Sequence, residues 1–125
     1  MILDTNALSA FADDDAAVVA QVGTADELYV PVIVLGEYRF GIAASRHRSE
    51  YEAWLTRGRA FWRILPVGEE TTAHYAAIRQ ELKKAGTPIP ANDTWIAALA
   101  RQHHLPVVSR DAHFDEVEGL TRLGW

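Results

Sequence analysis

The chain has 125 residues, of which 49% are hydrophobic and 23% charged, and its formal net charge is −5. It contains no cysteine, which excludes thiolate metal sites, thiol nucleophiles and disulfides, and its acidic balance argues against a protein that binds nucleic acid by bulk charge alone. Because no apolar run reaches the roughly 18 residues of a membrane span and MILDTN lacks the features of a signal peptide, we expect a cytoplasmic protein without membrane contact.

The first half of the chain alternates apolar runs with segments of helical character. Pro31 interrupts the run LYVPVIV, and since proline has no N–H for a strand ladder, the strand ends there or the next helix begins there. Thr5 or Asn6 is expected to cap the first helix. In chain order we predict a strand at 1–4, a helix at 7–11, a helix at about 15–22, a strand at 28–34 that ends at Pro31, and a helix at 32–45.

The second half continues the alternation. Residues 47–63 mix aromatic with charged residues, which indicates an amphipathic helix. Apolar and aromatic side chains recur at helical spacing between Tyr75 and Ala85, and Gly86 stops that helix. We predict helices at 47–63, 69–85 and 94–104, strands at 64–67 and 105–109, a turn or short helix at 110–114, and an edge strand at 119–125. This order predicts an α/β fold with a mostly parallel sheet.

Four acidic residues lie where predicted strands end or helices begin. Asp4 ends the first strand, Glu37 lies early in the helix after the second, and Asp111 follows the strand at 105–109. Because carboxyl ends of parallel strands share one edge, these side chains can converge, and Asp93 joins them if its helix packs against that edge. Taken singly, Asp4 is explained equally well as a helix cap or as a ligand, and Asp93 is explained better as a helix cap. Glu37 alone would be a solvated helix residue and Asp111 a turn residue, so the hypothesis depends on the four together.

A cluster of carboxylates has a specific chemical use. Such groups repel one another, and a divalent cation relieves the repulsion. Mg²⁺ and Mn²⁺ prefer oxygen ligands, and metal sites of this kind clamp the oxygens of a phosphodiester and lower the pKa of water. No serine, histidine or cysteine nucleophile is then required. The pattern predicts metal-dependent nuclease chemistry without selecting RNA over DNA.

Three segments that carry these residues resemble the PIN-domain nucleases, and among them the VapC-type toxins of toxin–antitoxin pairs. MILDTNALSAF is similar to an aliphatic strand followed by Asp-Thr-Asn, and VIVLGEYRFGI to a Glu followed four residues later by Gly. IPANDTWIAALARQHHLPVVSRDAHFDEVEGL resembles the last two motifs joined: Asp93 before Ile-Ala-Ala-x-Ala, then a Ser/Thr-x-Asp turn with His-Phe after it. The resemblance covers essentially the whole chain, and the joint occurrence of loose motifs in this order is specific.

The resemblance implies a fold and a site. The fold would be a three-layer α/β/α sandwich around a mostly parallel sheet of four or five strands, forming a single PIN domain over residues 1–125. The catalytic and metal-binding carboxylates would be Asp4, Glu37, Asp93 and Asp111. Asn6 and Ser109 match supporting polar positions, and Asp115 is a candidate for a supporting residue or an additional ligand.

The resemblance also implies a function and partners. The protein would be an endoribonuclease with Mg²⁺ as cofactor and Mn²⁺ able to substitute. As the toxin of a pair it would cleave RNA, with transfer or ribosomal RNA as the expected target. It would form a homodimer and be blocked by a cognate VapB-type antitoxin.

Two other classes of protein remain as alternatives. A non-catalytic interaction module could keep the same fold, although it would not need all four carboxylates. A receiver or phosphatase-like phosphotransfer domain also places acids at strand ends. The phosphatase pattern, however, needs a second Asp where Asn6 stands, and the receiver pattern needs a late lysine, whereas Lys84 on a predicted helix is the last one.

Other residues have competing interpretations. A solvated helix face is favoured slightly over a phosphate-binding surface for the basic stretch of Arg39, Arg46, His47, Arg48, Arg57, Arg59 and Arg63. Packing in a core or dimer interface is favoured over base stacking for Trp54, Phe61 and Trp62. His103 and His104 are expected to end a helix rather than bind metal. His113 is expected to pack on the surface rather than contact substrate.

Overall fold

The structure is a computed structural model that describes residues 1–125. Five short strands alternate with six α-helices and one 3-10 helix. In chain order they are β1 (Ile2–Leu3), α1 (Thr5–Ala12), α2 (Ala16–Val22), β2 (Leu28–Pro31), α3 (Val32–Ile42), α4 (Arg48–Gly58), β3 (Trp62–Leu65), α5 (Glu69–Ala85), α6 (Ala91–His103), β4 (Val107–Val108), η1 (Ala112–Glu116) and β5 (Arg122–Leu123). The predicted strand end at Pro31 and edge strand at the C-terminal end are confirmed.

The strands form one sheet in the order β3-β2-β1-β4-β5, and every neighbouring pair is parallel. The chain steps from β1 to β3 in one direction and then returns to place β4 on the other side of β1. Right-handed crossovers put the helices of that return on the opposite face of the sheet. Ligands of such sheets bind beyond the carboxyl ends of the strands where the order reverses, which here is the junction of β1 and β4.

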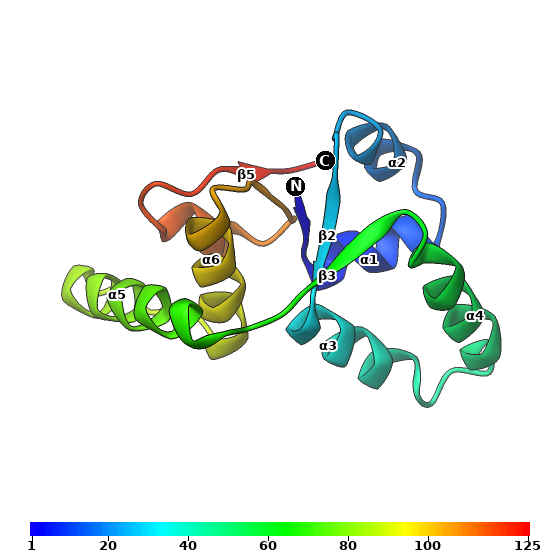
Figure 1. Ribbon diagram of the computed structural model, residues 1–125, viewed down its shortest axis with the longest axis horizontal. Coiled ribbons are helices and arrows are strands. Elements are labelled where there is room, and N and C mark those ends of the chain that lie inside the picture. The colour runs from blue at the N-terminus through cyan, green and yellow to red at the C-terminus, as the bar shows by residue number, and fades with distance from the viewer.

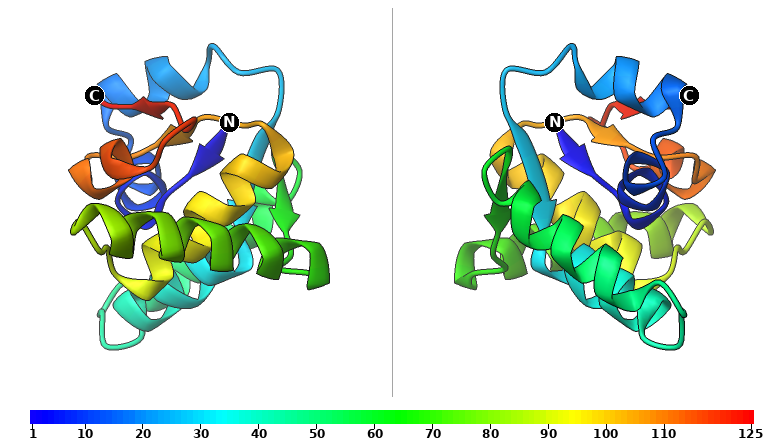
Figure 2. Two further views of the ribbon diagram at one scale, coloured as in Figure 1. Left: turned by 90° about the vertical axis from the view of Figure 1, so that its left-hand side faces the viewer. Right: turned by 90° about the vertical axis from the view of Figure 1, so that its right-hand side faces the viewer.

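Helices cover both faces of the sheet, so the predicted three-layer sandwich is confirmed. Helices α1, α2 and α4 lie on one side of β1 and β2, and α5 and α6 lie on the other (Figure 1). Helix α6 packs against the sheet with six buried residues, and α5 lies across its outer side (Figure 2). The core contains the fully buried Ile2, Val30 and Val107 of three adjacent strands. No helix combines the length and the apolar character needed to cross a membrane.

The helix predicted at 47–63 is shorter in the structure, and the next strand begins earlier. Helix α4 ends at Gly58, and Trp62 belongs to β3, where it pairs with Leu28 of β2. The Trp62 indole packs on Trp54, with 5.1 Å between ring centroids. Burial of this indole in the aromatic cluster outweighs the helical pattern of the sequence, because strand preference follows packing more than local propensity.

Two helix starts also differ from the prediction. Of the three candidate caps, Asp4 and not Thr5 or Asn6 caps α1, and its side chain accepts a hydrogen bond from the Thr5 backbone N–H at 2.7 Å. Helix α6 begins at Ala91, directly after Pro90, and not at 94. Proline fixes an extended entry into a helix and has no N–H to leave unsatisfied. Asp93 therefore lies within the first turn and is not the cap.

Gly58 is expected to tolerate no side chain. A Cβ built at this position would lie 1.7 Å from Cη2 of Trp62, inside a packed aromatic cluster. Gly58→Ala should therefore lower the free energy of unfolding by about 1–3 kcal/mol, as overpacking does. Urea denaturation measures this. The matched control is Gly41→Ala, a helical glycine with no atom within 4 Å of its Cβ position, which should gain about 0.5–1 kcal/mol. Equal effects at both positions would contradict the packing argument.

Candidate functional site

The four predicted carboxylates lie at the carboxyl end of the sheet, where the strand order reverses. Asp4 directly follows β1, and Asp111 follows β4 after a two-residue turn. Glu37 lies on α3, which contacts both α1 and α6, and Asp93 lies in the first turn of α6. The packing of α6 thus brings Asp93 to the strand ends, which the sequence left as an assumption.

Asp4 is the buried centre of this group, with 4% of its surface exposed. Its Oδ1 accepts from the Thr5 backbone N–H, and its Oδ2 accepts from Ser109 Oγ at 2.7 Å and from Asn6 Nδ2 at 3.1 Å. Oδ1 accepts only one hydrogen bond and keeps a free lone pair, whereas Oδ2 already accepts two. The side chain is therefore held rigidly while it can still bind a cation.

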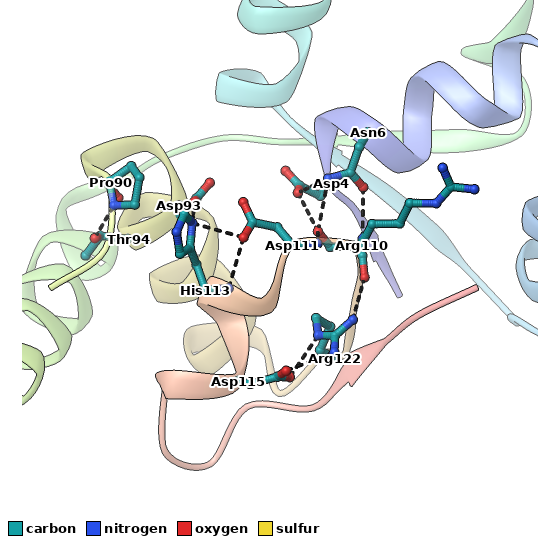
Figure 3. A network of polar contacts seen from close by, with 11 residues as sticks. Asp4, Asn6, Pro90, Asp93, Thr94, Arg110, Asp111, His113, Asp115 and Arg122 are labelled. Atoms are coloured by element: carbon teal, nitrogen blue, oxygen red, sulfur yellow. Dashed lines mark hydrogen bonds and ion pairs between the residues drawn. The ribbon is translucent and has the colours of Figure 1, made fainter. Parts of the chain in front are cut away.

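A hydrogen-bond network ties the loop after β4 to the start of α1 (Figure 3). Asn6 donates to Ser109 Oγ at 3.3 Å and accepts from the Arg110 backbone N–H at 3.1 Å. Ser109 Oγ in turn accepts from the Asp111 backbone N–H at 2.9 Å. Asn6 and Ser109 thus orient Asp4 and fix the turn that presents Asp111, the supporting roles expected of them.

His113 lies between two of the carboxylates, and not simply on the surface as expected. Its Nδ1 is 2.9 Å from Oδ2 of Asp93 and 3.0 Å from Oδ1 of Asp111 (Figure 3). Its backbone N–H donates to Oδ1 of Asp111 at 2.9 Å. The sequence indicated only the backbone part of this arrangement, the cap at Asp111, because the contact with Asp93 depends on the packing of α6.

Glu37 joins the group through α1. The Thr5 hydroxyl donates to Oε1 of Glu37 at 3.2 Å, so the residue next to Asp4 also orients the carboxylate on α3. Thr5 was expected only as a helix cap, and this contact depends on the packing of α1 on α3, which no local pattern reveals.

The carboxylates perturb one another. Burial raises the pKa of Asp4 from 3.8 to about 6; hydrogen bonds from Ser109 and Thr5 oppose the shift, and the charges of Asp93 and Glu37 add to it. Burial also raises the pKa of Asp93, with the hydrogen bond from His113 acting against it. The hydrogen bond to Asp93 raises the pKa of His113. Burial of these carboxylates, with a smaller contribution from their mutual repulsion, favours a bound cation.

The Asp115 carboxylate pairs with Arg122. Its carboxylate accepts two hydrogen bonds from the Arg122 guanidinium, both at 2.8 Å, and this pairing lowers the pKa of Asp115. Arg122 also donates to the Ser109 carbonyl oxygen at 3.1 Å. Asp115 therefore has a supporting role here, because it holds an arginine that anchors the loop carrying Ser109.

The structure also decides between the competing interpretations of the aromatic residues, His104 and the basic stretch. Trp54 and Trp62 pack in the aromatic cluster, whereas Phe61 is 75% exposed. His104 adopts a left-handed conformation that ends α6, as expected of a helix terminus. The basic stretch is exposed, and Arg39 forms an ion pair with Glu52 at 2.8 Å, in keeping with a solvated helix face.

The sequence matches the PIN domain over residues 1–120. The chain belongs to the PIN-domain family. It is 32% identical to the VapC ribonuclease Y4jK of Sinorhizobium fredii, over 96% of this chain and 93% of that protein. It is 33% identical to toxin FitB of Neisseria gonorrhoeae, over 89% of this chain and 87% of that protein. A structure of VapBC-5 from Mycobacterium tuberculosis, a member of the VapBC family of toxin–antitoxin systems, superposes with a TM-score of 0.73 at 29% identity, covering 98% of this chain and 94% of that one.

Membership of the PIN family accounts for the arrangement of the site. The PIN sheet places the ends of β1 and β4 side by side, and the acidic residues gather there. The match over nearly the whole chain agrees with the three motifs quoted from the sequence. It also removes the receiver and phosphatase-like alternatives, which belong to other folds.

Proposed function

We propose that this PIN domain is a metal-dependent endoribonuclease and the toxin of a VapBC-type toxin–antitoxin pair. The observation that carries the proposal is the acidic cluster at the junction of β1 and β4, within a chain similar to a VapC ribonuclease and to toxin FitB. Residues 1–125 act as one PIN domain, supported by a single sheet and one continuous core.

The donor set fits a divalent cation. Asp4, Asp93 and Asp111 offer carboxylate oxygens, and burial and neighbouring charges raise the pKa of Asp4 and Asp93. Oxygen donors of this kind suit Mg²⁺, with Mn²⁺ able to substitute. A bound ion would supply Lewis-acid stabilisation of the phosphodiester and lower the pKa of water at the reacting phosphorus.

The protein residues would divide the remaining work. Asp4, Glu37, Asp93 and Asp111 would hold the ion. Ser109 and Asn6 keep Asp4 in one orientation through hydrogen bonds of 2.7 and 3.1 Å. Rigid positioning of this kind raises the rate because the reacting groups need no rearrangement at the moment of reaction.

The partners follow from the same proposal. The substrate would be RNA, with transfer or ribosomal RNA as the expected class, which places the protein in the cytoplasm. A cognate VapB-type antitoxin would bind and block the site, and two copies of the chain would form a homodimer. The VapBC-5 structure supports this proposal through its fold and identity.

Cleavage of a total cellular RNA pool by the purified protein tests the proposal. We expect discrete cuts with Mg²⁺ or Mn²⁺ and none with EDTA. Cleavage that continues in EDTA would contradict the metal-dependent mechanism. Absence of cleavage of any RNA with either metal would instead favour a non-catalytic interaction module with the same fold.

A further inference from the structure

The imidazole of His113 lies where a cation bound by Asp93 and Asp111 would meet the protein. Its Nδ1 is 2.9 Å from one carboxylate and 3.0 Å from the other. One ligand atom from each of these three residues lies within 4.8 Å of the other two. The ring is also tethered, because the His113 backbone N–H donates to Asp111.

We propose that His113 binds the catalytic divalent ion through Nδ1, beside Asp93 and Asp111, and that this nitrogen makes the site prefer Mn²⁺ to Mg²⁺. The inference rests on the proposed function. It adds a nitrogen ligand to a site that the acidic residues alone would make an oxygen-only site.

The geometry around the ring supports the ligand role. The two carboxylates converge on a single ring nitrogen, and Nδ1 lies within about 3 Å of an oxygen atom of each. A divalent ion placed among these three ligand atoms would bind the lone pair of Nδ1 together with one oxygen atom of each carboxylate. The neutral ring then carries its proton on Nε2, and the side chain is 49% exposed, so water can solvate that group.

The choice of metal follows from ligand chemistry. Mg²⁺ binds oxygen almost exclusively and holds its water strongly, whereas imidazole nitrogen suits transition metals better. An imidazole added to the carboxylates of the site therefore raises its affinity for Mn²⁺ over Mg²⁺. Without the imidazole, the remaining carboxylates would discriminate less between the two ions.

The test is direct observation of the nitrogen by pulsed electron paramagnetic resonance of Mn²⁺ bound to the protein. Wild-type protein should show the ¹⁴N coupling of a directly bound imidazole, and His113→Asn should not. The matched control is His104→Asn, which removes an imidazole at the far end of α6 from a position where Asn tolerates the left-handed backbone. This control should keep the coupling.

Calorimetric titration with each metal gives an independent measurement. The ratio of the Mg²⁺ to the Mn²⁺ dissociation constant should fall about tenfold in His113→Asn, the size of effect typical of lost metal-site contacts, and stay unchanged in His104→Asn. Mn²⁺ that binds wild-type protein without ¹⁴N coupling, or an unchanged ratio in His113→Asn, would overturn the ligand role while leaving the proposed nuclease intact. Absence of binding of both Mg²⁺ and Mn²⁺ would overturn the ligand role and the metal-dependent nuclease together.

Discussion

Asp4→Asn and Asp93→Asn should each lower the rate of RNA cleavage at least about a thousandfold, because a metal site contributes several kcal/mol to transition-state stabilisation. Asp4 is the buried carboxylate at the junction of β1 and β4. Asp93 lies in the first turn of α6, and its negative charge acts on Asp4. Either substitution removes one anionic ligand while keeping the shape of the side chain. Single-turnover cleavage of a target RNA at saturating Mg²⁺ measures the effect.

The fold should survive both substitutions. Asparagine is as good a helix cap as aspartate, so the amide oxygen that replaces the Asp4 carboxylate can still accept from the Thr5 N–H. Circular dichroism and denaturation check this. The matched control is Asp26→Asn, an exposed carboxylate before β2 at the other end of the sheet, which should keep full activity. Near wild-type cleavage by both site variants would show that the metal site is wrongly assigned.

In metal-free protein, Asp4 should make the fold less stable as the pH rises. Its pKa increases from the ordinary value of 3.8 in an unfolded chain to about 6 in the folded chain, so the folded state binds the proton more tightly than the unfolded state. Stability therefore falls as the pH rises from about 4 to 6, and the full cost at neutral pH is about 3 kcal/mol. Asp4→Asn carries no such charge, so it should become more stable than wild type as the pH rises.

Urea denaturation in EDTA between pH 4 and 7 tests this, with the difference between Asp4→Asn and wild type as the readout. Taking the difference cancels the titration of distant groups. Added Mn²⁺ should stabilise wild type at pH 7 more than it stabilises the variant, because binding to the folded state alone stabilises a protein and the variant lacks one of the proposed ligands. A difference that does not change with pH would refute the raised pKa of Asp4.

The sequence predicted the parts of this protein that follow from hydrophobic pattern and chain order. The run MIL ending at Asp4 and the run PVV ending at Ser109 are buried parallel strands, and polar residues at their ends had to meet at one edge. Pro31 ended β2 for the local reason stated, the missing N–H. Each of these features depends on a single residue or on one run of apolar residues, so it could be predicted without knowing which distant segments are in contact.

The features that were missed depend on contacts between distant segments. Trp62 joined a strand because Trp54 and Phe11 pack around its indole, with 6.4 Å between the Phe11 and Trp62 ring centroids. The position of His113 requires α6 to bring Asp93 to the same point. Arg122 donates to Asp115 and to the Ser109 carbonyl oxygen, and no sequence pattern around this single arginine indicates either contact.

The contact between Ser109 and Asp4 joins residues that are 105 positions apart in the chain. Protein synthesis proceeds from the N-terminus, so β1 leaves the ribosome long before β4 has been made. Until then Asp4 lacks Ser109, Asp93 lacks its neighbours, and the sheet lacks the strand beside β1. A ribosome that makes this protein therefore never carries an assembled acidic site on a half-finished chain, and the RNA cleavage proposed above could begin only once translation is nearly complete.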